Sequence, residues 1–66
     1  MTVWINGERA DAGAATNLAE LAQKYGLRPN TVLIEYNGGA ILQREWEGQT
    51  LSEGDRIEFV RVVAGG

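Results

Sequence analysis

The chain of 66 residues contains neither cysteine nor histidine. Without cysteine it has no thiol nucleophile, no persulfide-carrying side chain and no thiolate ligand, and without histidine it has no imidazole base that titrates near neutral pH. A zinc site would have to be built from carboxylates alone, unlike the usual cysteine and histidine sites. We therefore expect no metal and no cofactor, and the terminal carboxylate becomes a leading candidate for covalent chemistry.

Long apolar runs and basic blocks are also missing. No apolar run approaches the roughly 20 residues that span a bilayer, and no charged segment followed by an apolar one opens the chain. Nine acidic and six basic residues give a formal net charge of −3, and no basic cluster is present to bind a phosphate backbone. We expect a soluble, cytoplasmic protein that binds neither membrane nor nucleic acid.

The short chain limits the domain to one small core. A domain of this size buries only about 60% of its unfolded surface, and its core rarely supplies more than about 3–5 kcal/mol of stability. Little area is left for an internal active-site cleft, so the sequence favours a partner of enzymes over an enzyme. We expect it to be a monomer when free.

Two pairs of carboxylates and several glycines are further candidate sites. Glu45 and Glu47 flank Trp46, and Glu53 precedes Asp55 by two residues. Paired carboxylates can perform general acid–base catalysis, but both pairs lie in predicted turns, so we interpret them as solvated charge. Trp46 is interpreted as a core or core-edge side chain. The glycines lack phosphate-loop spacing and are typical of turns.

The first half of the chain predicts a hairpin followed by a helix. Residues 2–5 run into Asn6-Gly7, a strong signal for a two-residue turn, and residues 8–11 return as a polar strand. Asn17 caps a helix with Glu20 at the third position, and Gly26 suits the left-handed residue that ends it. The helical apolar positions are Leu18, Leu21, Ala22 and Tyr25, with Leu27 folding back onto the core.

The second half predicts further strands. Residues 31–36 are apolar on both faces and suit a central strand, residues 40–42 suit a short one, and a tight turn at 51–55 leads into a last strand at 56–63. The order is β-β-α-β-β with room for one more short strand. This is an α+β fold, the ubiquitin-like β-grasp, in which the last strand lies beside the first. We expect a domain at 1–63 and a flexible Gly-Gly tail at 64–66.

Strand alternation predicts one open face on the sheet. Val3 and Ile5 point one way and Trp4 the other, and Ile57 and Phe59 should face the helix. The remaining positions, Trp4, Val60 and Val62, then form an exposed apolar patch that we predict binds a partner. The alternatives are that residues 43–50 cover this patch or that its members are merely single exposed side chains.

The chain ends in Ala64-Gly65-Gly66. A frayed end is the simplest explanation, but two glycines also allow a partner's pocket to close tightly around the main chain. The terminal carboxylate, with an ordinary pKa of about 3.3–3.7, is an oxygen nucleophile at neutral pH. Five extended residues reach at most about 17 Å, enough to carry it into a partner's buried site.

Five segments together resemble the ThiS family, the sulfur carrier proteins of thiamin biosynthesis. They are Asn6-Gly7-Glu8, Glu35-Tyr36-Asn37-Gly38, Trp46, the run from Leu51 to Val60, and the ending Val63-Ala64-Gly65-Gly66. The resemblance covers nearly the whole chain. One departure concerns the Pro-Arg that the family often carries before the tryptophan, where this chain has Gln43-Arg44-Glu45, so the role of Arg44 is open.

The resemblance implies a cycle centred on Gly66. A ThiF-like partner adenylates its carboxylate with ATP, a sulfur-donor protein displaces AMP to leave a thiocarboxylate, and a ThiG-like thiazole synthase receives the sulfur. Ala64 and Gly65 would form the tail that enters each partner. The carrier supplies the substrate and its partners supply catalysis.

Two alternatives stay open at the level of sequence. Another Gly-Gly carrier of this fold could serve molybdopterin, cysteine or tRNA thiolation, or protein conjugation. A plain β-grasp interaction module would use no chemistry at its tail, and removal of Gly66 would then leave its function intact.

Overall fold

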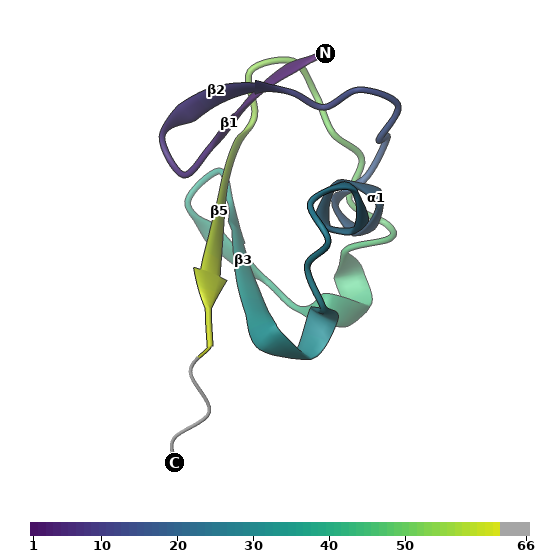
Figure 1. Ribbon diagram of the computed structural model, residues 1–66, viewed down its shortest axis with the longest axis vertical. Coiled ribbons are helices and arrows are strands. Elements are labelled where there is room, and N and C mark those ends of the chain that lie inside the picture. The colour runs from purple at the N-terminus through teal and green to yellow at the C-terminus, as the bar shows by residue number, and fades with distance from the viewer. Residues whose placement is uncertain (63–66) are drawn as a thin grey trace.

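The computed structural model describes residues 1–62, which form a five-stranded sheet and one α-helix (Figure 1). The strands and helix are β1 (Thr2–Ile5), β2 (Glu8–Asp11), α1 (Leu18–Lys24), β3 (Val32–Tyr36), β4 (Gly39–Ile41) and β5 (Arg56–Arg61), and two short 3-10 helices are η1 (Pro29–Thr31) and η2 (Gln43–Glu45). The optional short strand is present as β4, one residue earlier than predicted. Strand β5 ends at Arg61, before the predicted limit, and Val63 and the tail at 64–66 lie outside the described residues.

The first hairpin follows the prediction in detail. Asn6 has φ 51° and Gly7 has φ 82°, so both turn residues adopt the left-handed conformation that this kind of turn requires. Strand β2 pairs antiparallel with β1, with Val3 opposite Ala10 and Ile5 opposite Glu8. Local turn chemistry therefore sets this register.

Helix α1 begins and ends at the predicted residues. The Asn17 side chain accepts a hydrogen bond from the Glu20 N–H at 2.8 Å. The Glu20 carboxylate turns back one residue further than in the usual capping box, and it accepts from the Thr16 N–H and hydroxyl at 2.7 Å each. These bonds lower the pKa of Glu20, the backbone N–H contributing most.

The far end of α1 closes with the predicted glycine. Gly26 has φ 67°, its N–H donates to the Gln23 carbonyl at 2.9 Å, and the Leu27 N–H donates to the Ala22 carbonyl at 3.0 Å. This pair of bonds is a Schellman motif. It turns Leu27 back so that its side chain packs against the core, as the sequence indicated.

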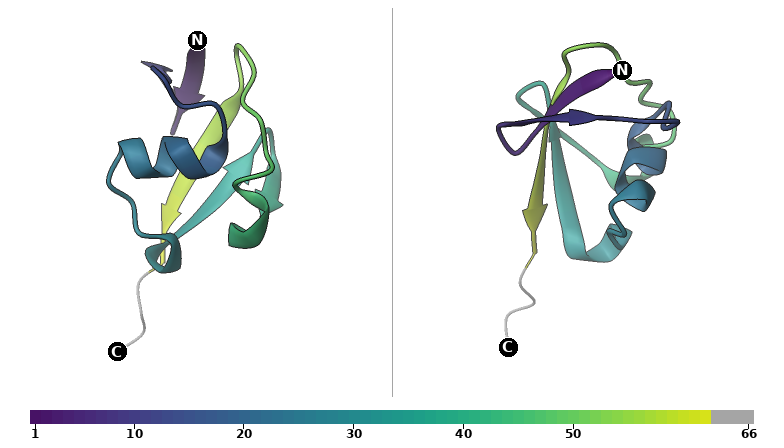
Figure 2. Two further views of the ribbon diagram at one scale, coloured as in Figure 1. Left: turned by 90° about the vertical axis from the view of Figure 1, so that its right-hand side faces the viewer. Right: turned by 45° about the horizontal axis from the view of Figure 1, so that its top comes forward.

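The sheet has the strand order β2-β1-β5-β3-β4. Strand β5 runs parallel to β1 and antiparallel to β3, so the last strand lies beside the first and in the middle of the sheet. The predicted β-grasp architecture is confirmed. Figure 2 shows α1 on one side of the sheet, running across the strands.

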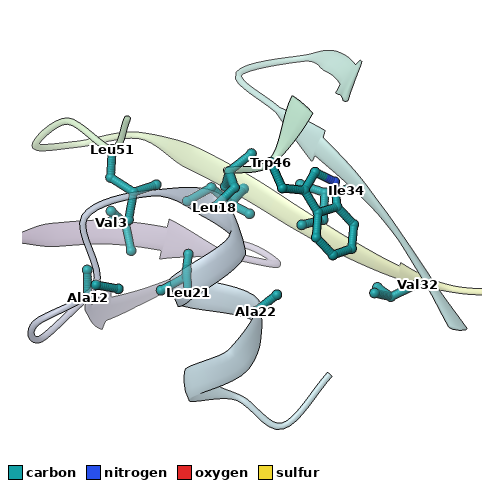
Figure 3. Packing of buried hydrophobic residues seen from close by; sticks show 11 residues of the cluster. Val3, Ala12, Leu18, Leu21, Ala22, Val32, Ile34, Trp46 and Leu51 are labelled. Carbon is teal, nitrogen blue, oxygen red and sulfur yellow. The ribbon is translucent and has the colours of Figure 1, made fainter. Parts of the chain in front are cut away.

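The core fills the space between the sheet and α1. Fully buried side chains come from both layers, namely Val3, Leu18, Leu21, Ile34 and Ile57. Trp46 is buried among them beside Ile34 (Figure 3), which confirms its assignment to the core. Tyr25 lies at the core edge, 44% exposed, with its ring 6.1 Å from that of Phe59.

The prediction that residues 31–36 form a central strand is confirmed. Its apolar run does not mean burial on both faces, because Leu33 is 60% exposed while Val32 and Ile34 are buried. The strand is central in its pairing, between β5 and β4, yet only one face of the sheet has a helix against it. A strand can have a neighbouring strand on each side and still be exposed on one face of the sheet. The apolar run in the sequence does not show which of its side chains lie on the exposed face.

Candidate functional site

The face of the sheet opposite α1 is open. Trp4 is 41% exposed, Val60 43% and Val62 46%, whereas Val3 and Ile57 on the other face are buried. The segment 43–50 does not cover this face. It packs on the helix side, where the Leu18 N–H donates to the Gln49 carbonyl at 3.1 Å and Trp46 enters the core.

The three predicted patch residues lie on this face but not in one place. Trp4 pairs with Arg56 at the start of β5, and Val60 comes four residues later, about 13 Å along the strand. Trp4 borders a shallow hollow with Arg56 and Glu58. Their partner-binding role remains a prediction.

Around Val60 the structure adds two residues that the sequence analysis missed. Leu33 stands directly opposite Val60 on β3, and Leu42, 55% exposed, follows β4 by one residue and lines the same groove as Leu33, Val60 and Val62. From here on, the apolar patch means these four side chains, Leu33, Leu42, Val60 and Val62. It differs from the predicted patch because it includes Leu33 and Leu42 and does not include Trp4. Strand alternation could have identified Leu33 from the sequence, because it places Leu33 on the same face as the charged Glu35 and opposite to Val32 and Ile34.

Charges on the open face fall into two bands. Arg9, Trp4 and Arg56 stand side by side across β2, β1 and β5. Further along β5, Glu58 stands opposite Glu35 of β3, between that basic band and the apolar patch. Both carboxylates are exposed.

A buried polar contact fixes the start of β5. Asp55 is 7% exposed, and its carboxylate accepts hydrogen bonds from the Tyr36 hydroxyl at 2.5 Å, the Ser52 N–H at 2.7 Å and the Asn37 amide at 3.2 Å. Burial raises the pKa of Tyr36 above its ordinary value, and the hydrogen bond and charge of Asp55 add to the rise. The contact ties the β3–β4 turn to the strand that leads to the tail.

Three of the four carboxylates that could form catalytic pairs accept hydrogen bonds that hold the fold together. The interpretation of Asp55 as solvated charge is wrong, because Ser52, Tyr36 and Asn37 enclose it. Glu53 accepts from the Thr2 N–H at 2.9 Å, and Glu45 accepts from the Leu42 N–H at 3.0 Å. Within residues 1–62 no group of three potential ligands is placed to hold a metal ion.

Arg44 lies in η2, away from the open face. It borders a groove lined also by Gln23 of α1, Trp46 and Glu47. The structure thus places Arg44 beside α1, in a groove other than the one that the apolar patch lines. No helix in the described part of the chain is long and apolar enough to cross a membrane.

The predicted covalent site, Gly66, and the tail residues Ala64 and Gly65 lie outside the described residues. The structure does define where the chain approaches them. The Val62 N–H donates to the Thr31 carbonyl at 2.9 Å, so the backbone is held against the start of β3 up to the last described residue. The apolar patch therefore lies beside the point from which the last four residues continue.

A mixed sheet in this strand order, with one helix on one face, defines a ubiquitin-like β-grasp protein. The model of the ThiS family matches residues 3–66. The chain belongs to the ThiS family.

Solved structures agree with this assignment. The crystal structure of the thiamine biosynthesis protein ThiS from Geobacter metallireducens superposes with a TM-score of 0.85 at 26% identity, covering 100% of both chains. A solution structure of a thiamine biosynthesis protein from the same organism gives a TM-score of 0.80 at 26% identity, covering 100% of this chain and 88% of the other.

Two curated relatives cover nearly all of this chain. An uncharacterized protein, ycf40, from Trieres chinensis is 31% identical over 98% of this chain and 89% of its own length. A thiazole synthase from Magnetococcus marinus is 33% identical over 100% of this chain, which spans only 20% of that longer protein.

Proposed function

We propose that this chain is a sulfur carrier for assembly of the thiamin thiazole and is not itself an enzyme. The observation that carries the proposal is the match to the ThiS family over residues 3–66, which includes both terminal glycines. The composition supports it, because a chain without cysteine or histidine leaves the terminal carboxylate as the group most suited to carry sulfur.

The chemistry begins with activation of the Gly66 carboxylate. A carboxylate oxygen attacks the α-phosphorus of ATP, pyrophosphate leaves, and an acyl adenylate forms. A hydrosulfide ion (HS⁻) provided by the sulfur donor then attacks the carbonyl carbon, AMP leaves with the former carboxylate oxygen, and loss of the S–H proton leaves a terminal thiocarboxylate. Activation is required because a free carboxylate is a poor acyl donor, and the partner enzymes supply the catalysis.

The described fold suits such a carrier. Strand β5 is paired on both sides and the chain stays bonded to β3 as far as Val62. The five residues from Val62 to Gly66 span at most about 17 Å when extended. A rigid domain can therefore remain on a partner's surface while Ala64, Gly65 and Gly66 enter its active site.

Three kinds of partner follow from this cycle. They are an adenylating enzyme of the ThiF type, a protein that donates sulfur, and a thiazole synthase of the ThiG type that accepts it. Support for the last comes from the Magnetococcus marinus thiazole synthase, of which one fifth is similar to this whole chain. When a carrier and its acceptor lie in one polypeptide, each is present near the other at a high effective concentration. Such an arrangement would favour direct transfer of sulfur between them.

Intact mass spectrometry tests the proposal. The chain is incubated with ATP, the adenylating enzyme of the same organism and a sulfide source, beside an identical chain from which Gly66 has been deleted. We expect the full-length chain alone to gain the mass that corresponds to exchange of one oxygen for sulfur.

An unchanged mass with an adenylating enzyme that is shown to be active would overturn the proposal. The chain would then be better described as a β-grasp interaction module. A gain of mass in the Gly66-deleted chain would likewise place the sulfur elsewhere than on the predicted carboxylate.

A further inference from the structure

The apolar patch extends over β3, β5 and the residues that directly follow β4 and β5. Leu33 and Val60 face each other on β3 and β5, Leu42 extends the patch beyond β4, and Val62 extends it toward the tail. All four line one groove and are 43–60% exposed. An exposed apolar patch bordered by polar residues commonly marks a protein contact.

A pair of like charges borders this patch. Glu35 and Glu58 are directly opposite each other on β3 and β5, one side-chain position away from Leu33 and Val60 on the same face. Like charges in this position destabilise a sheet. Among residues 1–62 neither carboxylate lies within ion-pair distance of a cation.

We propose that this face docks a protein that seats an apolar side chain on the patch and places an arginine or lysine between Glu35 and Glu58. One cation between two carboxylates would remove the repulsion that the free chain carries, and an arginine could bind both. The proposal rests on the proposed function in taking thiazole synthase as this partner.

A second copy of the chain fits the face poorly. Each copy has a formal net charge of −3, so two copies repel each other. Four aliphatic side chains also supply only part of the roughly 800 Å² that each partner contributes to a standard interface. The face is suited to a basic partner that also engages the tail.

Isothermal titration with the thiazole synthase of the same organism tests the charge pair. The double variant Glu35→Gln and Glu58→Gln removes both charges at nearly constant shape. The control, Glu8→Gln with Glu47→Gln, removes the same charge from exposed positions away from the open face. We expect Kd to rise about tenfold or more for the first variant and to change less than twofold for the control.

Thermal melting of the free variants provides the second readout. Removal of the facing charges should raise Tm while affinity falls, and a merely structural role for the two glutamates would not move stability and binding in opposite directions. A third variant, Leu33→Ser, should weaken binding by at least tenfold with little change of Tm, because its side chain is already exposed.

Several outcomes would overturn the inference. These are a Kd unchanged in the Glu35 and Glu58 variant, an equal loss in the control, absence of binding by the unaltered chain, or self-association through the patch in sedimentation. Sulfur exchange on the unaltered chain is measured separately by intact mass. If the binding difference is found but the unaltered chain gains no sulfur, the docking face is retained and the carrier function is rejected, and the opposite pair of results would do the reverse.

Discussion

At the scale of single residues, Tyr36 and Asp55 illustrate how a side chain gains a role that its sequence position does not reveal. Asp55 follows a glycine turn and resembles a surface charge in the sequence. In the fold it is buried and accepts bonds from Tyr36, Ser52 and Asn37. A buried carboxylate is stable only when such donors surround it, so the three donors and the turn that brings them together form one unit.

The raised pKa of Tyr36 predicts a loss of stability in alkali. Its ordinary pKa is 10.0 and burial with Asp55 raises it, so the folded state holds this proton more tightly than the unfolded chain. The stabilisation is complete below about pH 10 and is lost as the pH rises through the raised value. We expect urea melts of the unaltered chain to show this decline.

The substitution Tyr36→Phe checks the assignment. It should reduce stability at pH 7 by about 1.5–3 kcal/mol because a hydrogen bond to a carboxylate is lost, and it should flatten the decline above pH 10. Tyr25→Phe, which removes the exposed tyrosine instead, serves as the control. An alkaline decline that survives Tyr36→Phe would contradict the role given to this hydroxyl.

At the scale of elements, helix α1 shows how far short-range signals reach. Its first turn is closed by Asn17 and by Glu20 bonded to Thr16, and its end is closed by Gly26. All of these residues lie within one turn of the helix end that they serve. They set the limits of α1, while burial of Leu18, Leu21 and Ala22 supplies its attachment to the sheet.

Replacement of the capping residue should weaken the whole domain. Asn17→Ala removes the acceptor for the Glu20 N–H, and loss of such a cap costs about 0.5–2 kcal/mol. In a fold whose core supplies only about 3–5 kcal/mol, the midpoint of urea denaturation should fall measurably. Asn30→Ala, at an exposed position of η1, should shift it much less.

At the scale of the whole molecule, the two tryptophans mark the two sides of the sheet. Trp46 is 3% exposed and packs between the sheet and α1, whereas Trp4 is 41% exposed on the open face. One side carries the stability of the fold and the other is free for contact. A domain of this size has a single sheet, so one face forms the core with α1 and only the other face is left exposed.

Alanine substitution at each tryptophan tests this division. Trp46→Ala should cost about 3–5 kcal/mol, comparable with the stability of the whole domain, and should leave the chain largely unfolded by circular dichroism. Trp4→Ala should change Tm little and reduce affinity for thiazole synthase. A large fall in Tm for Trp4→Ala would instead make Trp4 a structural residue.

What the sequence determined by itself was local. Asn6-Gly7 specified the first hairpin, Asn17 and Gly26 specified the limits of the helix, and the glycine turn before β5 placed the last strand. In each case the deciding contacts join residues close together in the chain, so backbone preference and hydrogen-bond donors can be read directly. The β-grasp order followed because few arrangements accommodate two hairpins around one helix.

Only the tertiary structure decided which residues share the open face. Leu33 joins Val60, Glu35 meets Glu58, and Trp4 is separated from the apolar patch because β5 inserts between β1 and β3 in one particular register. That register depends on pairing between segments more than twenty residues apart, and a shift of one residue would reverse every side chain. The burial of Asp55 has the same origin, since its donors come from the far end of β3 and from the turn before β5.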